Sequence, residues 1–205
     1  DDGARVTPFL QRAGTFKSTQ VPFAVSGGTL VTELADFDLD GAPDCCVAGT
    51  QLTIWFNDGA ANFRPGQTIP RTGSSLLIRD LNSDGFADLV QPNLFTQSVQ
   101  VWINDGSGRF SEEGGRRLPP GKNGYLHWSI ADLDSDGDPD LWASGHARGK
   151  TDAWFSNDGS GFFALQAGKG LPIQTSQPSV SGDFDADGDT DVLVYRAGSS
   201  TQGVL

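Results

Sequence analysis

Apolar residues fall into short runs separated by turns rich in Gly, Asp and Asn. In the segment 23–70, apolar runs at 29–34 and 45–48 flank a dense acidic stretch. A third run ends before the Asn-Asp-Gly at 57–59, and a fourth begins at Phe63. Short runs rich in β-branched and aromatic residues and bounded by turn residues are typical of strands. Because no stretch has the period of a long amphipathic helix, the pattern predicts four short antiparallel strands here.

The same order of runs and turns recurs along the chain. The acidic stretch occurs four times, as DFDLDGAPD (36–44), DLNSDGFAD (80–88), DLDSDGDPD (132–140) and DFDADGDTD (183–191). The first three copies are followed by an aromatic residue, Asn-Asp-Gly and a later Phe, in WFNDGAANF (55–63), WINDGSGRF (102–110) and WFSNDGSGFF (154–163). Four strands repeated at intervals of about 45–50 residues are typical of a β-propeller blade.

The two ends of the chain complement each other. Residues 6–16 match a third strand, a turn and a fourth strand, while residues 179–195 supply a first strand, an acidic loop and a second strand. We therefore expect one all-β domain over 1–205, a propeller of four-stranded antiparallel blades in which the ends share a blade. Its expected repeats are 23–70, 71–119 and 120–172, with a shared blade of 178–205 plus 5–22. Alternatively, residues 203–205 begin a further strand, and the blade is completed by a longer chain or by a neighbouring molecule.

Each acidic stretch has the spacing of a cation-binding loop. We number positions from its first Asp and call the four copies loops 1 to 4. Side-chain oxygens stand at positions 1, 3, 5 and 9, Gly stands at position 6, and the backbone carbonyl of position 7 is a further donor. The candidate ligands are Asp36, Asp38, Asp40, Ala42 and Asp44; Asp80, Asn82, Asp84, Phe86 and Asp88; Asp132, Asp134, Asp136, Asp138 and Asp140; and Asp183, Asp185, Asp187, Asp189 and Asp191.

The chemistry of these donors favours Ca²⁺. Six or more hard oxygen ligands, without sulfur or imidazole, select Ca²⁺ over transition metals, and Mg²⁺ prefers a small octahedron with several waters. An EF-hand would need Glu at position 12, where the loops carry Val47, Gln91, Ala143 and Val194. We expect about four structural Ca²⁺ ions, and the alternative is a set of solvated acidic turns that bind nothing.

The motif Asp-x-Asp-x-Asp-Gly-x-x-Asp, followed by apolar residues within four-strand units, resembles the FG-GAP/VCBS repeat family. That family includes the calcium-binding blades of integrin α subunits and many secreted propellers. The resemblance covers nearly the whole chain and implies a calcium-binding propeller. Members usually have about seven blades, so four repeats depart from the pattern, and the resemblance does not identify a ligand.

Charge and composition narrow the class of partner. The chain carries 26 acidic and 14 basic residues, for a formal charge of −12, which argues against nucleic acid as a partner. No apolar run reaches the ~18–20 residues of a membrane span, so we expect no membrane insertion. The chain starts at Asp1 and contains no Met, which we interpret as a processed product, secreted or displayed at the cell surface.

Few residues suggest chemistry outside the loops. His127 and Trp128 depart from the repeat and are candidate ligand contacts, with ordinary packing as the alternative. Adjacent Cys45 and Cys46 are expected to be small buried strand residues, although an intermolecular or strained disulfide is also possible. A basic segment at 116–122 and the cluster His146, Arg148 and Lys150 form either solvated loops or a patch for an anionic partner. The Trp residues repeat with the blades, so we expect them in the core.

Three functions remain open. The first is a calcium-stabilised extracellular module that recognises protein or glycan, as in cell adhesion or carbohydrate binding. The second is an assembly subunit that self-associates by completing blades between molecules. The third is a polysaccharide lyase. The sequence lacks the cluster of His, Lys and Tyr that such an enzyme would need, so we expect no enzymatic activity.

Overall fold

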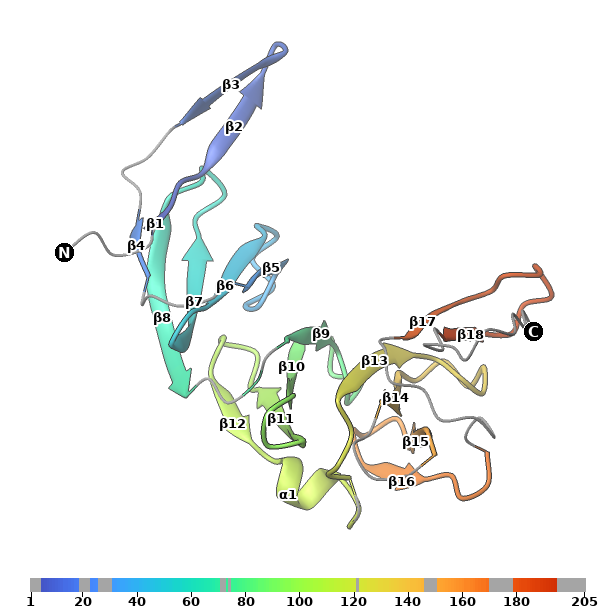
Figure 1. The fold of residues 1–205 in the computed structure, drawn as a ribbon. Helices are drawn as coiled ribbons and strands as arrows, with labels where there is room; N and C mark the ends of the chain where they lie inside the picture. The colour runs from blue at the N-terminus through green and yellow to red at the C-terminus, as the bar shows by residue number, and fades with distance from the viewer. Residues whose placement is uncertain are drawn as a thin grey trace, which may run out of the picture. The chain divides into compact units, whose positions relative to one another are not determined.

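The computed structural model describes residues 5–18, 23–25, 31–70, 73, 75–120, 122–145, 151–169 and 179–194. Within these ranges the regular secondary structure consists of strands, apart from one helix, the four-residue α1 (Gly114–Arg117) (Figure 1). The all-β prediction is confirmed.

Three four-stranded antiparallel sheets follow one another along the chain. The first contains β5 (Val31–Ala35), β6 (Asp44–Ala48), β7 (Gln51–Asn57) and β8 (Phe63–Pro70). The second contains β9 (Leu77–Arg79), β10 (Asp88–Asn93), β11 (Ser98–Asn104) and β12 (Phe110–Glu112). The third contains β13 (His127–Ala131), β14 (Asp140–Ser144), β15 (Ala153–Asn157) and β16 (Phe163–Leu165). Each sheet is ordered as in the sequence, so the predicted four-strand repeats are confirmed.

The register is the same in the three sheets. The residue after position 9 pairs with the aromatic residue two places before Asn-Asp-Gly, as Cys45 with Trp55, Leu89 with Trp102, and Leu141 with Phe155. Each acidic loop therefore joins the first two strands of its sheet, and each Asn-Asp-Gly turn joins the last two. Because successive antiparallel strands run in opposite directions, the acidic loop and the Asn-Asp-Gly turn of one sheet lie at the same end of its strands.

Three shorter sheets occupy the ends of the described chain. They pair β1 (Arg5–Val6) with β4 (Phe23–Ala24), β2 (Phe9–Arg12) with β3 (Thr15–Ser18), and β17 (Ser179–Gly182) with β18 (Asp191–Val194). The hairpin predicted within 6–16 is present as β2–β3, and its turn places Ala13 and Gly14 at φ values of 50° and 79°. The predicted pairing of 6–16 with 179–195 stays a prediction, and residues 195–205 lie outside the described ranges.

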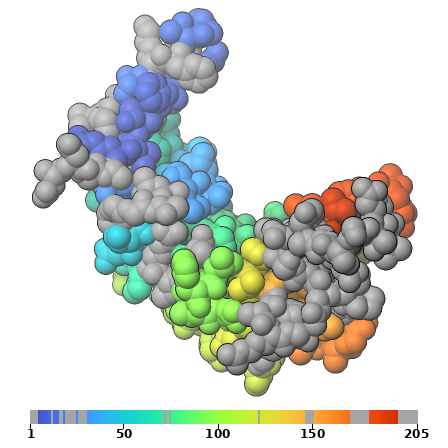
Figure 2. Space-filling model, in the orientation of Figure 1, coloured from blue at the N-terminus to red at the C-terminus, as the bar shows by residue number. Residues whose placement is uncertain are grey.

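The chain divides into two compact units, one of residues 1–72 and 104–111 and the other of residues 73–103 and 112–205. In the second unit, β13 lies beside both β9 and β17, so the first strands of three successive sheets are neighbours (Figure 1). The strands of the third sheet pair in the order β13, β14, β15 and β16, and the space-filling view shows yellow and orange atoms of this part of the chain (Figure 2). The prediction that the chain is a single domain stays a prediction.

Apolar side chains of the second and third sheets form the core of the second unit. Its buried cluster includes Leu81, Val101, Trp128 and Phe155, and the rings of Trp128 and Phe155 stack with centroids 5.4 Å apart. Burying one such side chain stabilises the fold by about 1.5–3 kcal/mol. The second strand of a sheet is the most completely buried, since every residue of β14, and of β6 in the first unit, is buried.

Candidate metal centre

The four acidic loops share one backbone conformation. Gly at position 6 adopts a φ of 89°, 89°, 95° and 98° in loops 1 to 4, as the predicted sharp bend requires. Position 4 is also left-handed although none of its residues is Gly, with φ between 55° and 63° in Leu39, Ser83, Ser135 and Ala186. A left-handed residue with a Cβ costs about 1–2 kcal/mol. The sequence analysis missed this feature, because the residue types at position 4 have little in common.

Hydrogen bonds within each loop hold this conformation. The position 1 carboxylate accepts the N–H of the position 6 glycine, at 2.9, 2.8, 2.9 and 3.1 Å in loops 1 to 4. The position 5 carboxylate accepts the N–H of position 7, at 2.8, 2.9, 2.9 and 2.9 Å. Such local bonds offset the strain at positions 4 and 6 and bend the loop around its carboxylates.

Carboxylate oxygens converge in three of the four loops. One oxygen from each of Asp36, Asp38 and Asp40 lies within 4.8 Å of the others, and the same holds for Asp132, Asp134 and Asp136. In loop 4 the converging group is Asp183, Asp185 and Asp191. Two oxygens bound to one Ca²⁺ at about 2.3–2.6 Å lie at most about 5 Å apart, so this spacing fits a shared calcium ion.

Loop 1 contains buried oxygens that accept no hydrogen bond. Oδ1 of Asp36 and Oδ1 of Asp38 are both inaccessible to solvent and without a donor. The other oxygen of Asp38 lies 3.8 Å from the exposed guanidinium of Arg64, an ion pair worth at most about 1 kcal/mol. A buried carboxylate oxygen without a partner is costly, so the two oxygens fit a cation between them.

Loop 2 differs because it has Asn82 at position 3. Its side-chain Nδ2 donates to Oδ2 of Asp84 at 2.9 Å, while its Oδ1 accepts the N–H of Asp84 at 3.3 Å. Asp80, Asn82 and Asp84 can therefore present side-chain oxygens to a cation, but with one negative charge fewer than the other loops.

Position 9 has a structural role that the sequence analysis missed. Asp44, Asp88 and Asp140 are completely buried. In loop 3, Asp140 accepts the N–H of Leu133 at 3.0 Å and the N–H of Asn157 at 2.7 Å, and the indole of Trp154 donates to it at 3.0 Å. These bonds join the loop to the third strand, and of the roughly four acceptor positions of the carboxylate, one on Oδ1 stays available to a cation.

Asp44 repeats this arrangement in loop 1. It accepts the N–H of Phe37 at 2.9 Å and the N–H of Asn57 at 2.8 Å. In loop 2 and loop 4, position 9 likewise accepts the N–H of position 2, from Leu81 and Phe184, at 3.0 Å in both. Position 9 is thus an anchor of the loop in all four copies.

The electrostatics of the loops oppose ionisation. Burial raises the pKa of Asp44 and of Asp140 above the ordinary 3.8, although backbone hydrogen bonds partly offset it. Burial, followed by the negative charge of Asp136, raises the pKa of Asp134. A bound cation would stabilise the ionised form of each of these groups.

The structure places the candidate contacts outside the loops in two different environments. Trp128 is 8% exposed and belongs to the core, in line with the packing alternative, whereas His127 is half-buried on the same strand. In the basic segment, Arg117 donates to Glu113 at 2.8 Å and to the carbonyl of Ser160 at 2.6 Å, and Lys122 donates to the carbonyl of Gly114 at 2.7 Å.

The cysteines and the repeated Trp residues lie in the sheets. The residues of the cluster at 146–150 lie outside the described ranges. Cys45 and Cys46 are buried and free, as expected from their position in a strand. Trp102 and Trp142 are buried, as predicted for aromatics that repeat with the blades.

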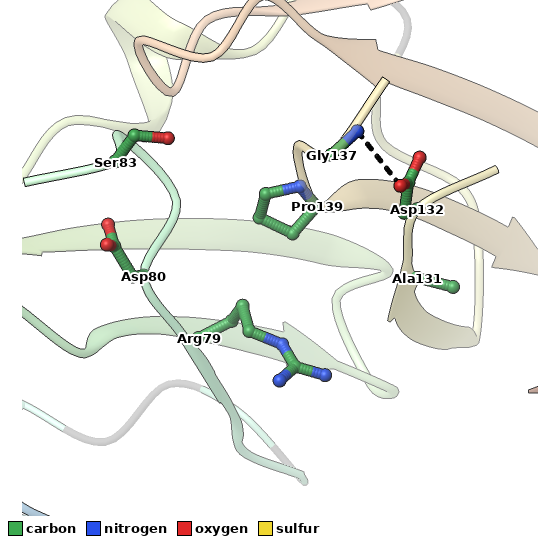
Figure 3. Close-up of a pocket in the computed structure, with 7 residues that line it drawn as sticks. All are labelled: Arg79, Asp80, Ser83, Ala131, Asp132, Gly137 and Pro139. Carbon is green, nitrogen blue, oxygen red and sulfur yellow. Dashed lines mark hydrogen bonds between the residues drawn. The ribbon is translucent and has the colours of Figure 1, made fainter. Parts of the chain in front are cut away.

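A cleft of about 280 Å³ separates loop 2 from loop 3 in the second unit. In Figure 3, Asp80 and Ser83 lie on one side and Asp132, Gly137 and Pro139 on the other, with Arg79 extending between them. The dashed line marks the bond from the Gly137 N–H to Asp132. The cleft brings two candidate metal loops to one surface.

Comparison with known proteins agrees with this repeat structure. The model of the FG-GAP-like repeat matches residues 36–91, 80–143 and 132–194, and each match runs from one acidic loop through the next. No curated protein matches the chain. The matches together cover most of the sequence and begin at the loops that define its repeats, and the chain belongs to the FG-GAP-like repeat family.

Proposed function

We propose that the acidic loops bind Ca²⁺, about one ion each, through the positions predicted from the sequence. The observation that carries this proposal is the convergence of three carboxylates in one loop, two of which contribute buried oxygens without a donor. The donors are hard oxygens, the kind that Ca²⁺ prefers. FG-GAP-like repeats often bind Ca²⁺, which further supports this proposal.

The ion would supply positive charge at the point where the first two strands of a sheet are joined. The carboxylates at positions 1 and 5 hold the loop conformation by accepting backbone N–H groups, and the carboxylate at position 9 connects the loop to the third strand. Calcium is therefore proposed as a structural ion that no substrate needs to touch. Because the site is assembled only in the folded chain, an ion that binds there stabilises the folded state and should raise the melting temperature.

We further propose that the repeats form a β-propeller that serves as an extracellular recognition module for protein or glycan, without enzymatic activity. The adjacency of β9, β13 and β17 supports the propeller, since first strands surround the central axis in that fold. FG-GAP-like repeats are typical of extracellular proteins. Among the described residues no helix is long and apolar enough to span a membrane. A glycan array and binding to acidic and basic test proteins would identify the class of partner.

A second candidate function is assembly by completion of blades between molecules. The sheets β2–β3 and β17–β18 have two strands each, where the complete repeats have four. Apolar side chains on them are open to solvent, with Phe9 60%, Val180 57% and Leu193 55% exposed. The mass in solution, measured by light scattering with Ca²⁺ and with EDTA, separates the two candidates. A strict monomer at all concentrations argues against assembly.

The calcium proposal is tested by thermal unfolding of the chain in EDTA and in Ca²⁺. We expect a melting temperature several degrees higher in Ca²⁺, and a smaller increase in Asp36→Asn, which removes one negative charge from loop 1 and leaves the other three loops unchanged. Ser18→Ala, distant in sequence from every loop, is a control that should respond like the wild type. An identical melting curve in EDTA and in Ca²⁺ would refute the proposal.

A further inference from the structure

The Asn-Asp-Gly turns of the second and third sheets each contact the acidic loop of the repeat before them. Asn157, at the end of β15, donates its side-chain Nδ2 to the backbone carbonyl of Leu81 at 2.8 Å. Leu81 is position 2 of loop 2, between the candidate ligands Asp80 and Asn82. This hydrogen bond is buried and joins residues 76 positions apart in the sequence. The third repeat thus holds the backbone of the candidate metal loop in the second repeat.

The same side chain also holds its own loop. Nδ2 of Asn157 donates to the carbonyl of Pro139 at 3.1 Å, and its backbone N–H donates to Asp140 at 2.7 Å. Its Oδ1 accepts the N–H of Gly161 at 3.0 Å, which closes the turn. Asn157 therefore contacts loop 2 and loop 3 together, and the two loops share one buried amide.

An equivalent contact occurs in the first unit. Asn104, at the end of β11, donates its Nδ2 to the carbonyl of Phe37 at 2.8 Å, and Phe37 is position 2 of loop 1. The ring of Phe110, four residues after Gly106 of that turn, packs edge-on against Phe37 with centroids 5.6 Å apart. The contact between one turn and the preceding loop is therefore a feature of the repeat rather than of one place in the chain.

Glycines allow this close approach. A Cβ on Gly161 would lie 3.3 Å from the carbonyl oxygen of Leu81 and 2.7 Å from the guanidinium of Arg117. A Cβ on the equivalent Gly108 would overlap the ring of Phe56 in the preceding repeat. Both glycines also have positive φ, at 76° and 71°. The turn is thus shaped to lie directly against the neighbouring repeat.

The burial of position 2 correlates with the presence of an Asn-Asp-Gly turn in the succeeding repeat. Phe37 and Leu81 are completely buried, and each is followed by an Asn-Asp-Gly turn that contacts it. Phe184, the same position in loop 4, is 57% exposed, and the described residues contain no later Asn-Asp-Gly turn. Leu133, the same position in loop 3, is only partly buried, and among the described residues no Asn-Asp-Gly turn follows that of its own repeat. The turn of the succeeding repeat therefore accounts for the complete burial of position 2 in loops 1 and 2.

We propose that Asn157 and Asn104 are positioning residues for the metal sites of loops 2 and 1, so that each site is completed by the repeat that follows it. This inference rests on the proposed binding of calcium. Position 2 is held at its N–H by position 9 of its own loop and at its carbonyl by the succeeding Asn. Because positions 1 and 3 are attached to the same two peptide groups, a rotation at position 2 moves both candidate ligands.

The test compares two isosteric variants. Asn157→Asp removes the donor to Leu81 and Pro139 but keeps an acceptor for Gly161. Asn57→Asp is the matched control, because among the described residues Nδ2 of Asn57 donates to Pro43 of its own loop, at 3.0 Å. Removal of a partner of a metal ligand typically costs about 10–100-fold in metal affinity.

Calcium titration of ¹⁵N-glycine-labelled protein reports each loop separately, because every position 6 glycine donates to a candidate ligand. The reporters are Gly41, Gly85, Gly137 and Gly188. In Asn157→Asp we expect about tenfold weaker binding at both Gly85 and Gly137, with Gly41 unchanged. In Asn57→Asp only Gly41 should shift its midpoint.

Other outcomes are distinguishable. An unchanged midpoint at Gly85 in Asn157→Asp, with Gly137 shifted, would overturn the positioning role while leaving calcium binding intact. If no glycine of the wild type responds to Ca²⁺, both proposals are wrong. If Asn157→Asp fails to fold, Asn104→Asp tests the same claim, with Gly41 expected to weaken and an unchanged Gly41 overturning it.

Discussion

Replacement of Asp140 by Ala tests the structural role of position 9 separately from metal binding. Its carboxylate accepts three hydrogen bonds, from the backbone of Leu133 and Asn157 and from the indole of Trp154, and it is completely buried. Asp140→Ala leaves these donors without an acceptor. Each buried donor left unsatisfied costs about 1–3 kcal/mol, for a gross loss of roughly 3–9 kcal/mol.

Part of this loss is recovered. Burial raises the pKa of Asp140, which means that the ionised carboxylate itself is costly in the fold, and the variant no longer bears that cost. Breaking a buried charged network by removing one partner typically destabilises by about 3–5 kcal/mol, and we expect a net loss of that size. Against a total stability of about 5–15 kcal/mol, the change is large.

The assay is urea unfolding followed by Trp fluorescence, carried out in EDTA so that no metal contributes. Asp134→Ala is the control, because this residue lies in the same loop and is exposed. Partial desolvation of its carboxylate, followed by the negative charge of Asp136, raises its pKa, so the ionised group does not stabilise the loop without a metal. In EDTA the control should be as stable as the wild type or more stable. If Asp140→Ala were equally unaffected in EDTA, the anchoring role of position 9 would be wrong.

Three further predictions follow from single contacts. Gly161→Ala places a Cβ 2.7 Å from Arg117 at a φ of 76°, and chemical unfolding should show a stability lower by about 1–3 kcal/mol. The control Gly168→Ala has a similar φ but open space around the added Cβ, and its stability should fall by only about 1 kcal/mol. Asn82→Asp adds a carboxylate to loop 2 and removes the amide that donates to Asp84. Calorimetric titration should therefore show about tenfold tighter calcium binding at one site. An unchanged affinity would contradict the role of Asn82 in loop 2. In EDTA, the free energy of unfolding should fall as the pH rises above 3.8. The pKa values of Asp44 and Asp140 are raised in the folded state, so the folded protein binds more protons than the unfolded chain in that range. A free energy of unfolding that rises there would contradict the assignment.

The strands and loops could be predicted because their signals are local and repeated. Four acidic copies in the same phase define where each first strand ends, and β6, β10 and β14 begin at the final Asp of their loops. The three Asn-Asp-Gly segments likewise define the last hairpin of each sheet. A single copy would have carried far less information.

Contacts between repeats could not be predicted in the same way. The bond from Asn157 to Leu81 depends on the distance between two turns that are remote in sequence. From sequence, that Asn is predicted only as part of a tight turn and Asp140 only as a metal ligand. For Trp128 the sequence leaves both a ligand contact and ordinary packing open. Each of these roles is decided by which neighbour the side chain meets.

The most direct test of the account is a crystal structure of the chain grown in Ca²⁺. We predict a metal ion in loop 1 with oxygens of Asp36, Asp38 and Asp40 at about 2.3–2.6 Å, and comparable ions in the other loops. Water in place of the ion, with the carboxylates turned apart, would contradict the central claim that the acidic loops are calcium sites.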